Sequence, residues 1–109
     1  MEDTFLVECV LIEGTSVVRF IGELDMAYSE RAKESGLAAL AALNGDGGPL
    51  VFDLSDLSYC DSSGIRAFVA VHDAACRGGR SVVLRNLRPM VKRVFELCAV
   101  DSCFRIEGD

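Results

Sequence analysis

Residues 50–65 read LVFDLSDLSYCDSSGI and contain the change from strand to helix around which the chain is organised. The apolar run Leu50–Leu54, entered through Pro49, predicts a short buried strand. Residues 55–60 are predicted to form a loop, after which a helix begins near Asp61 and ends near Arg77. Asp61 or Ser62 is a natural N-cap, because either side chain can accept a hydrogen bond from an unpaired amide of the first helical turn.

The flanking segments show the periods of both strands and helices. Two apolar runs over 5–12 and 16–22 are separated by a glycine-containing turn and predict an antiparallel hairpin. From about Met26 to Leu43 the apolar residues recur at helical spacing, and Gly45 is a candidate cap. The later elements are a strand over 81–84, a helix with Pro89 in its first turn and an edge strand over 102–106. This order predicts an α/β fold with a mixed sheet of four to five strands covered by helices.

Length and charge narrow the functional classes. With 109 residues the chain is expected to form one domain, 1–109. A net charge of −6 disfavours binding to nucleic acid or to an anionic membrane surface. There is no apolar run of the roughly 20 residues that a spanning helix needs. Glu2 and Asp3 stand where a signal peptide would be basic, so we expect a cytoplasmic protein.

The cysteines and glycines predict no metal site and no cofactor. The five cysteines form no CxxC pair and have no ligand spacing with the single histidine, His72. We expect them to be free, buried thiols that pack as small apolar groups. The glycine cluster over 44–48 lacks the lysine of a phosphate-binding loop and is predicted to be a turn.

The Asp61-Ser62-Ser63-Gly64 segment is the one place with the ingredients of a regulated site. A hydroxyl at the start of a helix is exposed, and the positive end of the helix stabilises added negative charge. The segment could therefore accept a phosphoryl group without unfolding. Helix capping alone explains the same residues, and the pattern by itself does not decide between the two interpretations.

Three stretches together resemble the STAS family, specifically the small bacterial anti-sigma-factor antagonists. They are Gly22-Glu-Leu-Asp25, the stretch Leu50–Ile65 with its DSSG element, and Asn86–Asp101 with the pattern N-x-x-P-x-V-x-R-x-F-E-L. They follow the family order and spacing along the whole chain.

The resemblance implies a single STAS-type domain that acts without catalysis. The unmodified protein would bind an anti-sigma factor, commonly a serine-protein kinase with an ATP-binding fold, and so release a sigma factor. That kinase would phosphorylate Ser62, the first serine of DSSG, and a phosphatase would reverse the reaction. The implied partner-binding residues are Asp25, Asp61, Ser62, Ser63 and Gly64.

Several alternatives stay open. Ser63 is the rival phosphate acceptor, although the resemblance favours Ser62. Cys60 stands where the family usually has a bulky apolar residue, and a thiol beside the switch raises a redox hypothesis. A serine hydrolase is disfavoured, because His72 lies about ten residues, or roughly 15 Å of helical rise, beyond Ser62. A STAS scaffold or regulatory subunit of a stress-signalling or lipid-transport complex would have the same fold with another partner.

Overall fold

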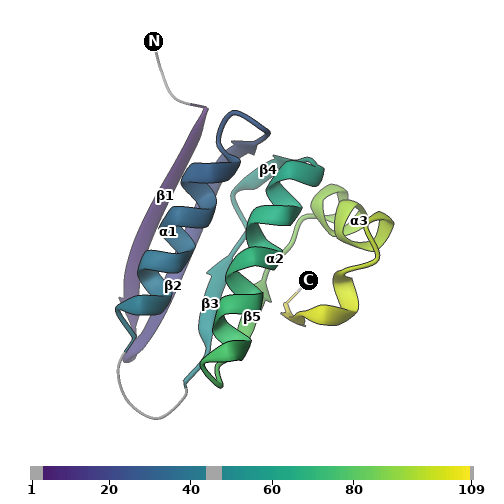
Figure 1. Cartoon of the computed structure of the whole chain (residues 1–109). Helices are drawn as coiled ribbons and strands as arrows, with labels where there is room; N and C mark the ends of the chain where they lie inside the picture. The colour runs from purple at the N-terminus through teal and green to yellow at the C-terminus, as the bar shows by residue number, and fades with distance from the viewer. Residues whose placement is uncertain (1–3, 44–47, 109) are drawn as a thin grey trace.

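The computed structural model describes residues 4–43 and 48–108, and Figure 1 shows α1 and α2 packed side by side on one face of a sheet. The elements in chain order are β1 (Phe5–Ile12), β2 (Thr15–Leu24), α1 (Ser29–Ala41), β3 (Leu50–Asp53), β4 (Leu57–Cys60), α2 (Ser62–Arg77), β5 (Val82–Arg85), α3 (Pro89–Leu97), the 3₁₀ turn η1 (Asp101–Cys103) and β6 (Arg105–Glu107). The predicted α/β class, the hairpin and the three helices are confirmed. Gly45, Glu2 and Asp3 lie outside the described residues, and α1 ends at Ala41.

The sheet is mixed and has six strands. Strands β1 and β2 are antiparallel, and parallel pairs continue the order β1-β2-β3-β5-β6. The prediction of a loop over 55–60 is wrong for its last four residues, because residues 57–60 form β4 beside the last part of β2. These four residues contain a single serine and no alternation of polar and apolar side chains, so their local pattern does not predict a strand. They form a strand because they pair with β2, which is distant in the sequence.

Strand β2 pairs with two other strands, and Gly22 lies at a bulge in the second pairing. Residues 17–19 of β2 pair with β3 and residues 22–24 pair with β4, and the register of the β2–β4 pairing shifts between Gly22 and Glu23. Gly22 has a φ of +100°, and a Cβ there would collide with the backbone oxygen of Thr4. Both features require glycine at this bulge. Strand β4 ends beside Leu24, at the end of β2, and α2 begins directly after it.

Phenylalanine rings dominate the core between the sheet and the helices. Phe68 of α2 lies at its centre, with ring centroids 5.0 Å from Phe20, 5.6 Å from Phe52 and 6.0 Å from Phe95. All four rings are fully buried. Because aromatic side chains bury large apolar areas, this cluster fixes α2 against the sheet along its middle. The start of α2 then lies at the sheet edge near β4, as Figure 1 shows.

Candidate functional site

Ser62 is the first residue of α2 and is exposed. The N-cap is Asp61, whose Oδ1 accepts hydrogen bonds from the backbone N–H groups of Ser63 (2.9 Å) and Gly64 (3.1 Å). Asp61 therefore does the capping, and within the described part of the chain the Ser62 hydroxyl makes no hydrogen bond. Its oxygen is free for chemistry at the surface.

Backbone contacts join the start of α2 to the end of β2. The Asp61 N–H donates to the Leu24 carbonyl oxygen at 3.2 Å. Gly64 is buried against the same residue, since a Cβ at Gly64 would lie 2.7 Å from Leu24 Cγ and 2.7 Å from Cys60 Sγ. Glycine at this position lets the first turn of α2 lie directly on the sheet.

This junction brings Asp25 to the same edge of the molecule as the DSSG segment. Asp25 follows Leu24 directly, and its Oδ1 accepts a hydrogen bond from the backbone N–H of Ala27 at 2.9 Å. Its carbonyl oxygen accepts from Tyr28 at 3.1 Å, which turns the chain toward α1. Asp25 and residues 61–64 are far apart in sequence and adjoin in the fold.

Two exposed apolar side chains near this edge were not predicted from the sequence. Met26, the neighbour of Asp25, is 77% exposed, and Tyr59 of β4 is 44% exposed. Single apolar residues near turns carry no periodic signal, so only the three-dimensional structure distinguishes them from core residues. They are exposed apolar area near the DSSG segment: Met26 lines a groove together with Ser63, and Tyr59 lies two residues before Asp61 in the chain.

An open groove of about 330 Å³ runs between α1 and α2 beside the serines. Its lining includes Met26, Lys33, Ser63 and Arg66. Lys33 Nζ lies 3.4 Å from Glu30 Oε2, whereas Arg66 has no ion-pair partner among the described residues. Ser63 lines this groove and is half-buried, so it is less accessible than the exposed Ser62.

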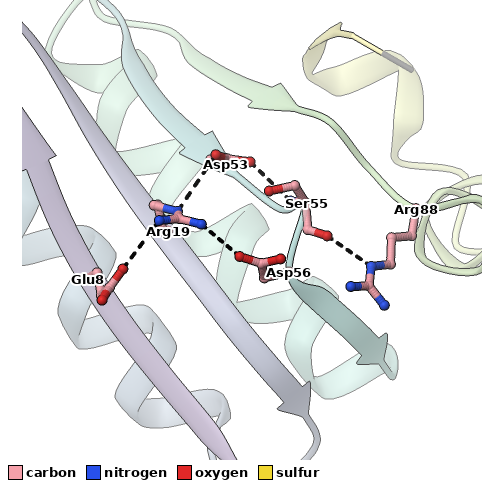
Figure 2. Close-up of polar contacts among 6 residues, drawn as sticks. All are labelled: Glu8, Arg19, Asp53, Ser55, Asp56 and Arg88. Carbon is pink, nitrogen blue, oxygen red and sulfur yellow. Dashed lines mark hydrogen bonds and ion pairs between the residues drawn. The ribbon is translucent and has the colours of Figure 1, made fainter. Parts of the chain in front are cut away.

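The β3–β4 loop, which leads into the site, is held from two sides (Figure 2). Arg19 of β2 lies 2.7 Å from Asp56, 3.5 Å from Glu8 and 3.8 Å from Asp53. Arg88, which precedes α3, donates from Nε to the Ser55 carbonyl oxygen at 2.9 Å. Each exposed ion pair contributes at most about 1 kcal/mol, but three carboxylates around one guanidinium form a network. The loop therefore places β4, and with it Asp61, in a defined position.

Cys60 is buried, and its environment opposes the redox hypothesis. The side chain is 2% exposed. Burial, followed by the charge of Asp61 and then Cys98, raises the pKa of the Cys60 thiol from 9.0 to about 12. Reaction requires a thiolate, so Cys60 is an inert core thiol at neutral pH. The wider expectation of buried thiols is wrong, because Cys9, Cys76 and Cys103 are exposed.

The raised pKa of Cys60 predicts a pH dependence of stability. Between pH 9 and 12 the folded thiol keeps a proton that the unfolded thiol has lost, so the free energy of unfolding falls as pH rises through this window. Urea unfolding at pH 8 and pH 10 should show a fall of about 1 kcal/mol that Cys60→Ala removes. The control is Cys103→Ala, an exposed thiol, which should retain the wild-type slope. The same pH slope in wild type and Cys60→Ala would contradict this account.

The described residues form neither a metal site nor a membrane-spanning helix, and His72 lies far from Ser62. Among residues 4–43 and 48–108, no group of three or more His, Cys, Asp or Glu side chains could hold a metal ion. In that part of the chain no helix has the length and apolar character needed to cross a bilayer. His72 packs on Phe104 with ring centroids 4.8 Å apart, about 15 Å of helical rise from Ser62.

Comparison with known proteins agrees with the fold. The family model of the STAS domain matches residues 7–109. The fold is thus that of a STAS domain, and the chain belongs to that family. A curated relative, the anti-sigma-B factor antagonist of Bacillus subtilis (strain 168), is 30% identical over 96 residues, covering 88% of this chain and 84% of the relative.

Solved structures show the same architecture. A crystal structure of an anti-sigma factor antagonist from Mycobacterium paratuberculosis matches with a TM-score of 0.76 and 26% identity, over 94% of this chain and 85% of that one. The Bacillus cell fate determinant SpoIIAA in its phosphorylated form matches with a TM-score of 0.63 and 24% identity, over 94% and 89%. At that identity the second likeness is one of fold alone.

Proposed function

We propose that this protein is an anti-sigma factor antagonist that is switched by phosphorylation of Ser62. The unmodified form binds an anti-sigma factor, a serine-protein kinase with an ATP-binding fold, and thereby releases a sigma factor. A phosphatase acts on the phosphorylated form and restores binding. The relatives named antagonists support the general role. The observation that supports phosphorylation at this position is the exposed Ser62 hydroxyl, which makes no hydrogen bond within the described residues.

The proposed partner surface consists of Asp25, Asp61, Ser62, Ser63 and Gly64, together with Met26. Their proximity follows from the hydrogen bond of Asp61 to Leu24 and from the close packing of Gly64. The surface joins acidic groups to an exposed apolar side chain, and Arg66 adds a cation without an ion-pair partner in the described chain. Such a mixture suits a specific and reversible protein interface.

Phosphorylation would oppose binding through local charge. A phosphate on Ser62 adds about −1.5 to −2 charges beside the Asp61 carboxylate. Asp61 already occupies the amides of Ser63 and Gly64, so the phosphate would not share those donors. Water compensates the charge in the free protein, but an interface removes that water at a penalty of a few kcal/mol. The switch needs no refolding, because Ser62 is already at the surface.

This role involves no catalysis by the chain itself. Ser62 would need a neighbouring base to act as a nucleophile, and the only histidine packs on Phe104 further along α2. The kinase and phosphatase activities are therefore assigned to partners.

Peptide mapping by mass spectrometry tests the modification. The protein is isolated from its native host under phosphatase inhibition and also treated in vitro with the candidate anti-sigma kinase and ATP. We expect one phosphoryl group, on Ser62, that Ser62→Ala abolishes and Ser63→Ala retains. Phosphate on Ser63, or no phosphate under both conditions, would overturn the proposal and favour a STAS scaffold with another partner.

A further inference from the structure

We propose that Cys76 and His72 form a thiol–imidazole pair at which a small disulfide attaches covalently to this protein. The two residues are one helical turn apart on α2. Cys76 Sγ lies 3.5 Å from His72 Nε2 and 3.9 Å from Nδ1, and Cys76 is exposed. A nucleophile within hydrogen-bond reach of a base is the arrangement that activates a thiol for attack.

The imidazole is held in place by the core. The His72 ring packs on Phe104, with centroids 4.8 Å apart and planes inclined at 49°. Phe104 is buried and packs in turn against Phe95, with centroids 5.7 Å apart. The contact with this buried ring holds the imidazole in place, and a fixed base loses less entropy when it reacts.

The other cysteines lack this partner. The sequence contains a single histidine, and within the described residues the only thiol in hydrogen-bond reach of it is that of Cys76. Cys60 is buried, whereas Cys9 and Cys103 are exposed without an imidazole. The chain thus contains two exposed thiols that serve as internal controls for the pair.

The proposed reaction is thiol–disulfide exchange. His72 Nε2 takes the proton of the Cys76 thiol, and the thiolate attacks one sulfur of a small disulfide such as oxidised glutathione. A new S–S bond forms at Cys76 while the original S–S bond breaks. The leaving sulfur departs with the electron pair of that bond and takes the proton from the imidazolium. The disulfide is the only co-reactant needed.

The pair is remote from the proposed partner surface. Cys76 lies fourteen positions after Ser62 on α2, or about 21 Å of helical rise. This inference does not depend on the proposed function of Ser62.

The test exposes the full chain to oxidised glutathione, quenches samples with acid at timed intervals and locates the mixed disulfides by peptide mass mapping. We expect Cys76 to react at least about tenfold faster than Cys9 and Cys103, since general-base assistance commonly gives larger factors. His72→Phe keeps a ring against Phe104 but removes the base, and should lower the rate at Cys76 to that of Cys103. The rates at the two control thiols should not change.

Two outcomes would overturn the proposal. One is equal or faster modification of Cys9 or Cys103 in the wild-type protein. The other is an unchanged rate at Cys76 in His72→Phe. If that variant loses the circular dichroism spectrum of the wild type, His72→Gln supplies the same comparison, and its unchanged rate would count equally against the pair.

Discussion

Replacing Ser62 with aspartate is expected to weaken binding to the anti-sigma factor by about a hundredfold or more, whereas Ser62→Ala should bind as the wild type does. The aspartate places a permanent charge beside Asp61 at the exposed start of α2, where Asp61 already occupies the amides of Ser63 and Gly64. Burial of this charge in an interface removes its water, a desolvation cost that alanine at the same position does not have. Alanine adds no charge and removes only a hydroxyl without a hydrogen-bond partner in the described residues.

Isothermal titration calorimetry with the purified anti-sigma factor measures the effect. The matched control is Ser81→Asp, which makes the same charge change at an exposed position just before β5, at the opposite end of the sheet. It should leave the affinity unchanged. Equal affinities of Ser62→Ala and Ser62→Asp would refute the electrostatic mechanism, and equal losses in Ser62→Asp and Ser81→Asp would point to overall charge instead of the site.

Gly64→Ala is expected to lower the free energy of unfolding by about 2 kcal/mol, because it overpacks the contact between α2 and the sheet. The added Cβ would lie 2.7 Å from Leu24 Cγ, in a side chain that is fully buried and has no room to move. Alanine favours a helix over glycine by about 1 kcal/mol, so helix propensity alone predicts the opposite sign. A loss of stability in Gly64→Ala would therefore be due to the close approach between residue 64 and Leu24.

Urea unfolding followed by circular dichroism gives the difference. Gly48→Ala is the control, because a Cβ at exposed Gly48 has no described heavy atom within 4 Å. Its stability should match or slightly exceed that of the wild type. A Gly64→Ala variant as stable as this control would show that α2 can shift freely on the sheet. The position of Ser62 would then not depend on glycine at residue 64.

Much of the fold could be predicted from local patterns. The capping residues near Asp61, and Pro89 in the first turn of α3, predicted helices that the structure contains. The apolar run Leu50–Leu54 was expected to form a buried strand, and its apolar residues are buried in and directly after β3. These features depend on residues a few positions apart, for which periodicity and capping are reliable signals.

Features that depend on distant contacts were missed. Residues 57–60 show no alternation, and they form β4 only through pairing with β2. Cys9, Cys76 and Cys103 were expected to be buried and are exposed, because cysteine has no fixed preference that neighbouring residues reveal. The apolar Met26 and Tyr59 carried no signal of their exposure.

The sequence alone predicted a helix start capped by Asp61 or Ser62, because a cap is a contact with residues two and three positions further on. The structure assigns the cap to Asp61 and leaves Ser62 next to it. The sequence also determined the class of fold through the order of its apolar runs. The folded chain was needed to show that Asp25 lies beside Asp61 and that Cys60 lies in the core. The pairing of β2 with β4 and the hydrogen bond from Asp61 to Leu24 bring together segments more than thirty residues apart. These long-range contacts depend on the free energy of packing the whole core, and a short stretch of sequence does not reveal how distant segments will pack.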